Sequence, residues 1–285
     1  MNKALDLISK IICFVLCLLL FCVLFVNLIL NLVPQIINTR NIEELVVRLD
    51  SETILGKETY SELYQRCIDQ GLDAVTIEKV LSLDEIKPIY GKLMGHATEF
   101  VLYGKNNNSI TTSDIIGTVE KYLDKIVLEF KVKLTAEQRN AILEQVKDET
   151  GVMSQNLTLE DVTSEEFTAS DLKTIQFLFG GTLQFLLWVV IAIIVLVIAL
   201  FRWSIYRFAM WTGITTTITG VCFVLISIGI ANVIVMSNSF QVGNELLNFI
   251  QHNVLNPITK EGIIVTLIGA IQVGYYSLIK YQKGY

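Results

Sequence analysis

The stretch IICFVLCLLLFCVLFVNLILNLVPQIINT, residues 11–39, decides the fold because it is long, apolar and free of charged residues. About 20 apolar residues in a helix cross the roughly 30 Å hydrocarbon core of a bilayer. Three further charge-free runs, at residues 174–201, 208–244 and 262–279, are each long enough to do the same. The sequence therefore predicts a multi-pass membrane protein with four transmembrane helices.

The first run is longer than the apolar core of a secretory signal peptide, which spans about 7–15 residues. The segment NLVPQIINTR that ends it offers no small-x-small cleavage site. We therefore expect the first run to be a retained anchor.

Positive charges beside the four runs predict the orientation of the chain. Short loops rich in Lys and Arg remain in the cytoplasm. Both termini and the short loop at 202–207 carry this bias and are expected in the cytoplasm, which leaves residues 40–173 and 237–261 outside. The cations concerned are Lys3, Lys10, Arg202, Arg207, Lys280 and Lys283.

These observations predict a mainly α membrane protein with a mostly helical extracytoplasmic domain inserted between transmembrane helices one and two. The predicted segments are a cytoplasmic N-terminus (1–10), transmembrane helix one (11–37), the extracytoplasmic domain (40–173), transmembrane helix two (175–201), a cytoplasmic loop (202–207), transmembrane helix three (208–236), an extracytoplasmic loop with an amphipathic helix (237–261), transmembrane helix four (262–279) and a cytoplasmic tail (280–285).

Helical spacing dominates the pattern of apolar residues in the segment 40–173. Ser82 and Glu85 resemble a cap ahead of a helix that ends near Leu102 and begins late or kinks at Pro88. A second helix is expected over about 114–130. Thr135 and Gln138 form a capping box for a third, which is expected to stop near Gly151. Ser170 and Asp171 are expected to cap the helix that enters the membrane.

Two short segments, 46–55 and 73–83, fit either a strand or a frayed helix. The acidic stretch around Glu160, Asp161, Glu165 and Glu166 is interpreted as a solvated linker. In the second outer loop, apolar spacing predicts an amphipathic helix from about 240 to 254, and Pro257 is expected to mark the turn before transmembrane helix four.

Charge and cysteine content restrict the partners and the compartment. Residues 40–173 contain 25 acidic and 15 basic residues, a balance that gives no electrostatic reason to bind nucleic acid. Of the five cysteines only Cys67 falls in this segment, so the predicted outer domain cannot form an internal disulfide. That absence fits the plasma membrane of a bacterium better than an animal cell surface.

No motif in the sequence supports catalysis. The chain has no G-x-S-x-G, P-loop or H-E-x-x-H motif and no Cys/His metal spacing. We expect no catalytic, cofactor-binding or metal-binding residues, no cofactor, and a protein that is not an enzyme.

Polar and small residues inside the predicted spans are the candidate functional residues, because hydrocarbon penalises polar groups without partners. Asn27 and Asn31 share one helix face, and a stripe of small and hydroxyl residues follows transmembrane helix three. Two interpretations remain open, tight helix packing and a polar path through the bundle. The residues concerned are Asn27, Asn31, Gly213, Thr216, Thr217, Gly220, Ser227 and Gly269.

The layout of four spans with a large outer domain between the first two resembles the permease subunits of MacB/FtsX-type ABC systems. That resemblance implies a transport subunit that works with a cytoplasmic ATPase. It covers topology alone, because the inner loop FRWSIYRFAMWTG has two arginines and no acid and does not match the loop of that family.

Two functions follow as hypotheses. The first is a non-enzymatic membrane protein whose outer domain binds or senses a ligand or partner of the cell envelope. The second is a transport subunit or a pore-forming protein. The expected partners are membrane lipid, together with another membrane or envelope protein or further copies of this chain.

Overall fold

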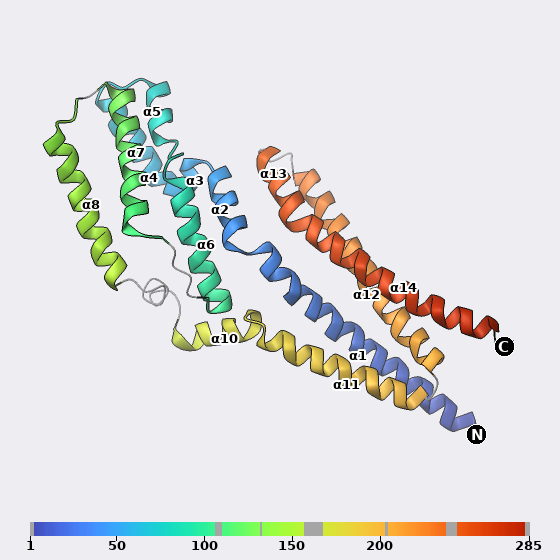
Figure 1. Ribbon diagram of the computed structural model, residues 1–285. Helices are drawn as coiled ribbons and strands as arrows, with labels where there is room; N and C mark the ends of the chain where they lie inside the picture. Colours follow the sequence, from blue (N-terminus) through green and yellow to red (C-terminus); the bar gives the residue numbers. More distant parts are fainter. Residues whose placement is uncertain are drawn as a thin grey trace. The chain divides into compact units, whose positions relative to one another are not determined.

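The computed structural model describes residues 3–105, 110–131, 133–156, 168–202, 205–237 and 244–282, and over these residues the chain is helical and contains no strand. Four helices are long and apolar enough to cross a membrane. They are α1 (Lys3–Ile36), α11 (Thr182–Arg202), α12 (Ile205–Ser237) and the continuous segment Leu246–Gln282, most of which is α14 (Asn256–Gln282) (Figure 1). The predictions of a helical fold and of four apolar helices are confirmed.

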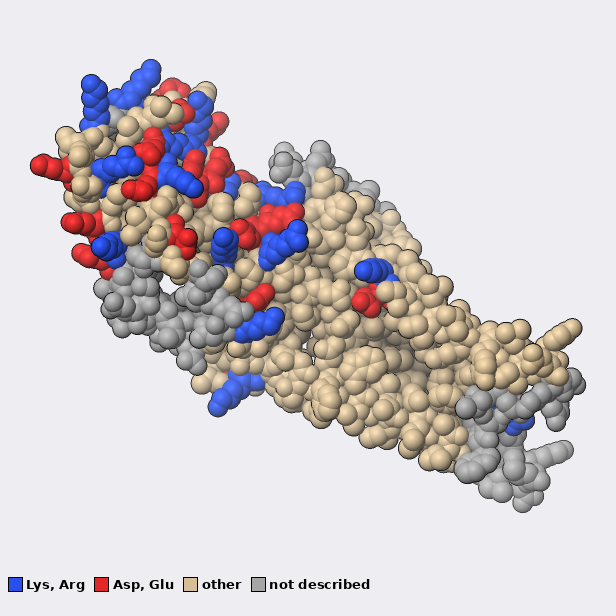
Figure 2. Space-filling model, in the orientation of Figure 1, with Lys and Arg blue, Asp and Glu red and all other residues tan. Residues whose placement is uncertain are grey.

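The chain divides into two compact units, one made of residues 1–36 and 177–285 and the other of residues 37–176. We call them the membrane unit and the helical domain. Charged side chains gather on the helical domain in Figure 2, whereas the visible surface of the four apolar helices is almost free of them. This contrast matches the separation of the charge-free runs from the acidic segment in the sequence.

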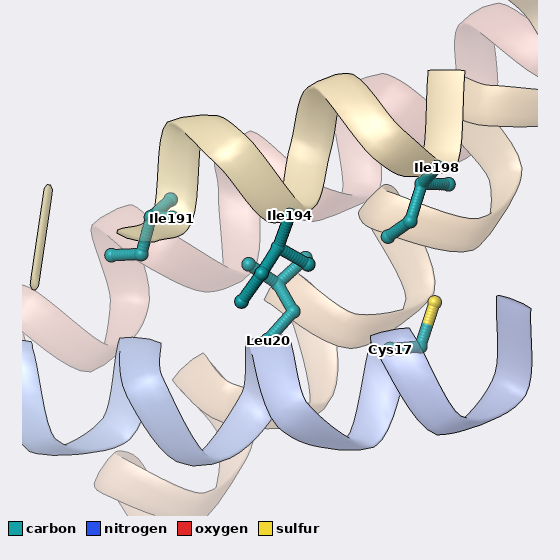
Figure 3. Packing of buried hydrophobic residues seen from close by; sticks show 5 residues of the cluster. All are labelled: Cys17, Leu20, Ile191, Ile194 and Ile198. Carbon is teal, nitrogen blue, oxygen red and sulfur yellow. The ribbon is translucent and has the colours of Figure 1, made fainter. Parts of the chain in front are cut away.

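Interlocking apolar side chains hold the membrane unit together. Leu20 on α1 points toward Ile194 on α11, and Ile191 and Ile198 extend this contact one turn in each direction (Figure 3). Toward the other end of α1, Leu28 and Leu32 pack against Phe223 of α12 and Ile258 of α14. Residues three and four apart share a helix face, which is why these positions meet.

The second charge-free run is not one helix, contrary to the sequence prediction. Helix α10 (Ala169–Phe179) ends before Gly180, and Gly181 has a φ of +94°. That conformation is open to glycine and strained for other residues, so the pair Gly180–Gly181 separates α10 from α11. The predicted cap is also shifted, because Thr168 rather than Ser170 forms the reciprocal cap with Asp171.

The segment before α14 also differs from the prediction. Helix α13 (Asn244–Ile250) continues through a π-helix, η1 (Gln251–Leu255), directly into α14. The predicted turn at Pro257 is therefore wrong, since Pro257 is the second residue of α14. The amphipathic helix expected near 240–254 is present from Asn244 onward, and the part before Asn244 lies outside the described residues.

The helical domain is built from short helices with side-chain caps. The segments 46–55 and 73–83, for which a strand was an alternative, form helix. The helices are α2 (Thr39–Arg48), α3 (Ser51–Leu55), α4 (Lys57–Asp69), α5 (Ala74–Leu81), α6 (Lys87–Tyr103), α7 (Thr112–Phe130) and α8 (Ala136–Asn156), with α10 at the boundary of the unit.

Cap predictions in this domain have mixed outcomes. Thr135 and Gln138 exchange both hydrogen bonds of a capping box, at 3.2 and 3.0 Å, as predicted. Ser82 does not cap α6, because its hydroxyl donates to the carbonyl of Lys79 at the end of α5. Helix α6 begins at Lys87, so Pro88 lies in its first turn, where a missing N–H costs nothing.

Helix α8 continues past the predicted stop at Gly151. The acidic stretch at 160–166 lies outside the described residues.

Helices α2 and α6 approach each other through two glycines of α6. A Cβ on Gly91 would lie 2.8 Å from the Cα of Glu43, and one on Gly95 would lie 2.7 Å from the Cα of Thr39. Real Cβ atoms do not come so close to backbone. The contact also includes a hydrogen bond from the Thr39 amide to the Glu99 carboxylate at 3.0 Å.

Candidate functional site

The two predicted asparagines of α1 have different surroundings. Asn27 is 1% exposed, and its Oδ1 has no hydrogen-bond partner among the described residues. The Oδ1 of Asn31 accepts a hydrogen bond from Gln184 of α11 at 3.3 Å. Gln35 donates to the Asn31 carbonyl at 3.3 Å and to the Glu261 carboxylate at 3.4 Å. Asn31 therefore joins α1 to a neighbouring helix, whereas Asn27 carries a buried acceptor without a donor.

The threonine hydroxyls of α12 bond to their own helix. Thr216 donates to the carbonyl of Thr212 at 2.9 Å, and Thr217 donates to that of Gly213 at 2.8 Å. The hydroxyls of Thr212, Thr215 and Thr219 also donate four residues back. Each threonine hydroxyl has one hydrogen. The stripe therefore offers acceptor oxygens rather than a row of free donors.

Glycines bring the backbones of α12 and α14 into contact, and both helices contribute them. A Cβ on Gly220 would lie 2.6 Å from the Gly262 carbonyl oxygen and would collide with Thr266, whereas one on Gly269 would lie 2.7 Å from the Gly213 carbonyl oxygen and would collide with Thr217. The two segments share one pattern, GITTTITG at 213–220 and GIIVTLIG at 262–269. The contact is reciprocal and leaves no space for a further side chain between these backbones.

A recess of about 670 Å³ lies beside the end of α12 that contains Ser227 and beside the α13–η1–α14 segment. Its volume is within the range of small-molecule sites. Ser227, one of the predicted residues, is 3% exposed and lies 2.7 Å from Thr259, oxygen to oxygen. The polar residues of its lining are Ser227, Asn248, Gln251, Asn256 and Thr259.

The π-helix beside this recess has a local cause in the sequence. Pro257 lacks an N–H, and its ring clashes with the carbonyl four residues earlier in an α-helix. The backbone widens ahead of it, and the Asn256 amide bonds to the carbonyl of Gln251, five residues back. π-Helical turns occur frequently at functional sites. Here the turn places Gln251 and Leu255 in the wall of the recess.

A second concavity, which we call the cleft, lies in the helical domain between α6 and α7 and has a volume of about 490 Å³. Its lining includes Lys92 from α6, Lys121 and Asp114 from α7, and Glu85 from the segment before α6. Neither lysine forms a hydrogen bond or a salt bridge within the described residues, whereas both acids do.

The two carboxylates of the cleft are held by other groups. Glu85 accepts a hydrogen bond from the Nζ of Lys125 at 3.1 Å, so its charge is offset. Asp114 accepts from the hydroxyl of Thr111 at 2.6 Å and from its amide at 2.9 Å. These bonds, with a smaller contribution from the charge of Lys92, lower the pKa of Asp114. The two lysines and two acids of the lining balance in charge, but both acids are engaged by other groups, whereas the lysines form no hydrogen bond or salt bridge among the described residues.

Sequence reasoning missed both the cleft and most of the recess. Lys92 and Lys121 belong to different helices, and nothing in their local sequence marks them. Gln251 was assigned only to the polar face of the predicted amphipathic helix, and Thr259 to the loop after it, although the proline two residues before Thr259 was a usable signal of irregular helix. In the part of the chain that the structure describes, no three His, Cys, Asp or Glu side chains are grouped as metal ligands are.

Comparison with known protein families, characterised proteins and solved structures finds no match for this chain. The likeness to MacB/FtsX-type permeases therefore remains one of layout, and no residue role comes from it.

Proposed function

We propose that this chain is a non-enzymatic integral membrane protein whose helical domain lies on the extracytoplasmic side and binds a small anionic ligand of the envelope in the cleft. The observation that carries this proposal is the pair of lysines, Lys92 and Lys121, which line one concavity and form no hydrogen bond or salt bridge among the described residues. Such an ammonium pair attracts phosphate or carboxylate groups.

The acidic charge of the surrounding domain makes this lysine pair selective for small anions over large ones. The acidic segment as a whole disfavours large anions such as nucleic acid, because long-range repulsion acts over the whole contact surface. A small anion inside the cleft lies within a few ångströms of the lysines, and charges farther away than about 8–10 Å are screened at physiological salt. The cleft is therefore suited to a small ligand or to a single acidic group of a partner.

The binding test uses the full chain in lipid nanodiscs, with inorganic phosphate and citrate as probes in titration calorimetry. Replacing both lysines, Lys92→Gln with Lys121→Gln, is expected to weaken binding at least about tenfold, since each lost charged hydrogen bond is worth roughly 1.5–3 kcal/mol. Lys57→Gln, an exposed lysine of α4 outside the cleft, is the matched control. Equal binding by the double variant and the wild type would refute the proposal.

Orientation is tested separately by thiol labelling on intact cells. With the native cysteines replaced, single cysteines at Lys105 and Asn248 are expected to react with an impermeant reagent, and one at Ser204 is not. Labelling at Ser204 alone would place the helical domain in the cytoplasm.

The alternative, a transport subunit or pore, predicts flux through vesicles that contain the protein. The close glycine contact between α12 and α14 supports binding over conduction within one chain. Solute flux that disappears in Asn27→Leu with Asn31→Leu, while the thermal stability stays unchanged, would favour transport instead. An ATPase that co-purifies from native membranes would point the same way.

A further inference from the structure

We propose that the recess beside the π-helix η1 binds the uncharged, hydroxylated headgroup of a lipid, such as a sugar attached to diacylglycerol. This inference goes beyond the proposed function. The recess lies in the membrane unit, and it shares no residue with the cleft.

The polar side chains of the recess exclude a charged headgroup. Every polar residue of the described lining carries an amide or a hydroxyl, and this described lining contains no Lys, Arg, His, Asp or Glu. A charged group removed from water without a partner is strongly destabilised. A phosphate in this recess would therefore lack a compensating charge, whereas a neutral polyol would not need one.

The hydrogen bonds at the buried end of the recess favour a ligand that donates hydrogen bonds to the protein. Thr259 donates to the Leu255 carbonyl at 2.9 Å. The hydroxyl of Ser227 lies 2.7 Å from that of Thr259 and 3.2 Å from the same carbonyl. Each hydroxyl has one hydrogen, and both hydrogens are used inside this group. What remains for a ligand is acceptor oxygens, which pair with sugar or glycerol hydroxyls but not with an ionised phosphodiester.

Amides at the mouth of the recess complement the same chemistry. Asn248 and Gln251 are exposed, and each amide both donates and accepts. A hydroxyl of a sugar also does both, so one amide can pair with two neighbouring hydroxyls. The amide of Asn256 is partly engaged, with its nitrogen 3.3 Å from the Nδ1 of His252.

Apolar surface beside these groups indicates that the occupant is a lipid rather than a free sugar. Ile228 of α12 lines the recess and is 52% exposed, and Leu247 and Ile250 face it from α13. Ser227 and Ile228 belong to the apolar segment Arg207–Val233, which is long enough to cross a membrane. A helix that crosses the bilayer brings the residues near its ends to the level where headgroups meet acyl chains, and Ser227 lies toward the Val233 end of that segment.

The test measures lipid retention by the full chain in detergent with native mass spectrometry. Monoglucosyl diacylglycerol is expected to remain bound and to resist competition by phosphatidylglycerol. Asn248→Leu with Gln251→Leu is expected to weaken retention about tenfold, because both amides lose their hydrogen bonds to the headgroup. Both side chains are exposed, so folding should be preserved, and a thermal melt checks this.

Asn232→Leu is the matched control, because Asn232 is an exposed amide near the same end of α12 and does not line the recess. Retention by this variant should equal that of the wild type. Equal retention of phosphatidylglycerol, or wild-type retention by the Asn248/Gln251 variant, would overturn the inference. Displacement by methyl glucoside at the same concentration would overturn the lipid assignment. None of these results bears on phosphate binding at Lys92 and Lys121.

Discussion

Glycine brings helix backbones into contact in both units of this molecule, but the two contacts are built differently. Between α12 and α14 both helices supply glycines, and Gly220 and Gly269 each meet a threonine and a carbonyl of the other helix. Between α2 and α6 only α6 supplies them, and the facing backbone belongs to Thr39 and Glu43. In water, apolar burial helps to hold a helix pair together. Lipid is as apolar as leucine, so a membrane pair depends more on close packing.

The largest loss of stability is expected when side-chain atoms are added at the glycine contact between α12 and α14. Gly220→Ala with Gly269→Ala adds two methyl groups that collide with Thr266 and Thr217. Overpacking costs typically ~1–3 kcal/mol per site. We expect a lower melting temperature in detergent and a lower folded yield. Gly229→Ala, where an added Cβ meets nothing within 4 Å, is the control and should show no loss. A double variant that melts like the wild type would contradict the observed contact.

A smaller loss is expected from Gly95→Ala in the helical domain. The added Cβ would lie 2.7 Å from the Cα of Thr39, at one site instead of two. Helix α2 has 10 residues and can shift to relieve part of the collision. Gly117→Ala, where an added Cβ meets nothing within 4 Å, should instead stabilise the domain by about 0.5–1 kcal/mol. Thermal melts of the full chain compare the two, and a stabilising Gly95→Ala would show that the α2–α6 contact is loose.

Asn27→Leu is expected to change stability by less than about 1 kcal/mol, because a buried acceptor without a donor contributes little to folding and its removal relieves desolvation. The variant separates polar from packing contributions inside the membrane unit. Thermal unfolding in detergent is the measurement, with Asn31→Leu as the comparison, since Asn31 bonds to Gln184. A large loss at Asn27 would mean that its amide has an essential partner.

The smallest loss of stability is expected at acidic pH, and it should be confined to the helical domain. Hydrogen bonds accepted from threonines at the helix N-termini lower the pKa of Asp73, Asp114 and Asp171 below the ordinary value of 3.8. Their stabilisation is present above that value and is lost as pH falls through the lowered pKa of the folded state. Far-ultraviolet circular dichroism melts from pH 6 to pH 2 should show the loss. Asp114→Asn should reduce it, and an unchanged melting temperature at pH 2 would contradict the assignment.

What the sequence predicted well depended on composition over long windows. The four apolar helices follow from charge-free runs, and Gly213, Gly220 and Gly269 were recognisable from their helical spacing beside threonines. These features depend on a single helix, its length or its face. They are therefore available before any tertiary contact is known.

What the sequence did not predict depends on backbone angles and on contacts between helices. Gly180–Gly181 divides an apolar run, because hydropathy contains no information about a φ of +94°. Ser82 satisfies the pattern of a cap, but its hydroxyl is already bonded to the end of α5. Lys92 and Lys121 become a pair only when α6 and α7 are placed side by side.

The π-helix η1 determines the direction in which the side chains of α14 point around the helix axis. One residue added to a helix turns the later side chains by about 100°, since 3.6 residues complete a turn. Without the wide turn at Gln251–Leu255, the positions now held by Gly262, Thr266 and Gly269 would face roughly a quarter-turn away from α12. Removing one residue from η1 would thus bring Ile263 to the position of Gly262, where even a Cβ would lie 3.0 Å from side-chain atoms of Phe223 and Val224. Through this wide turn, Pro257 determines which face of α14 packs against α12.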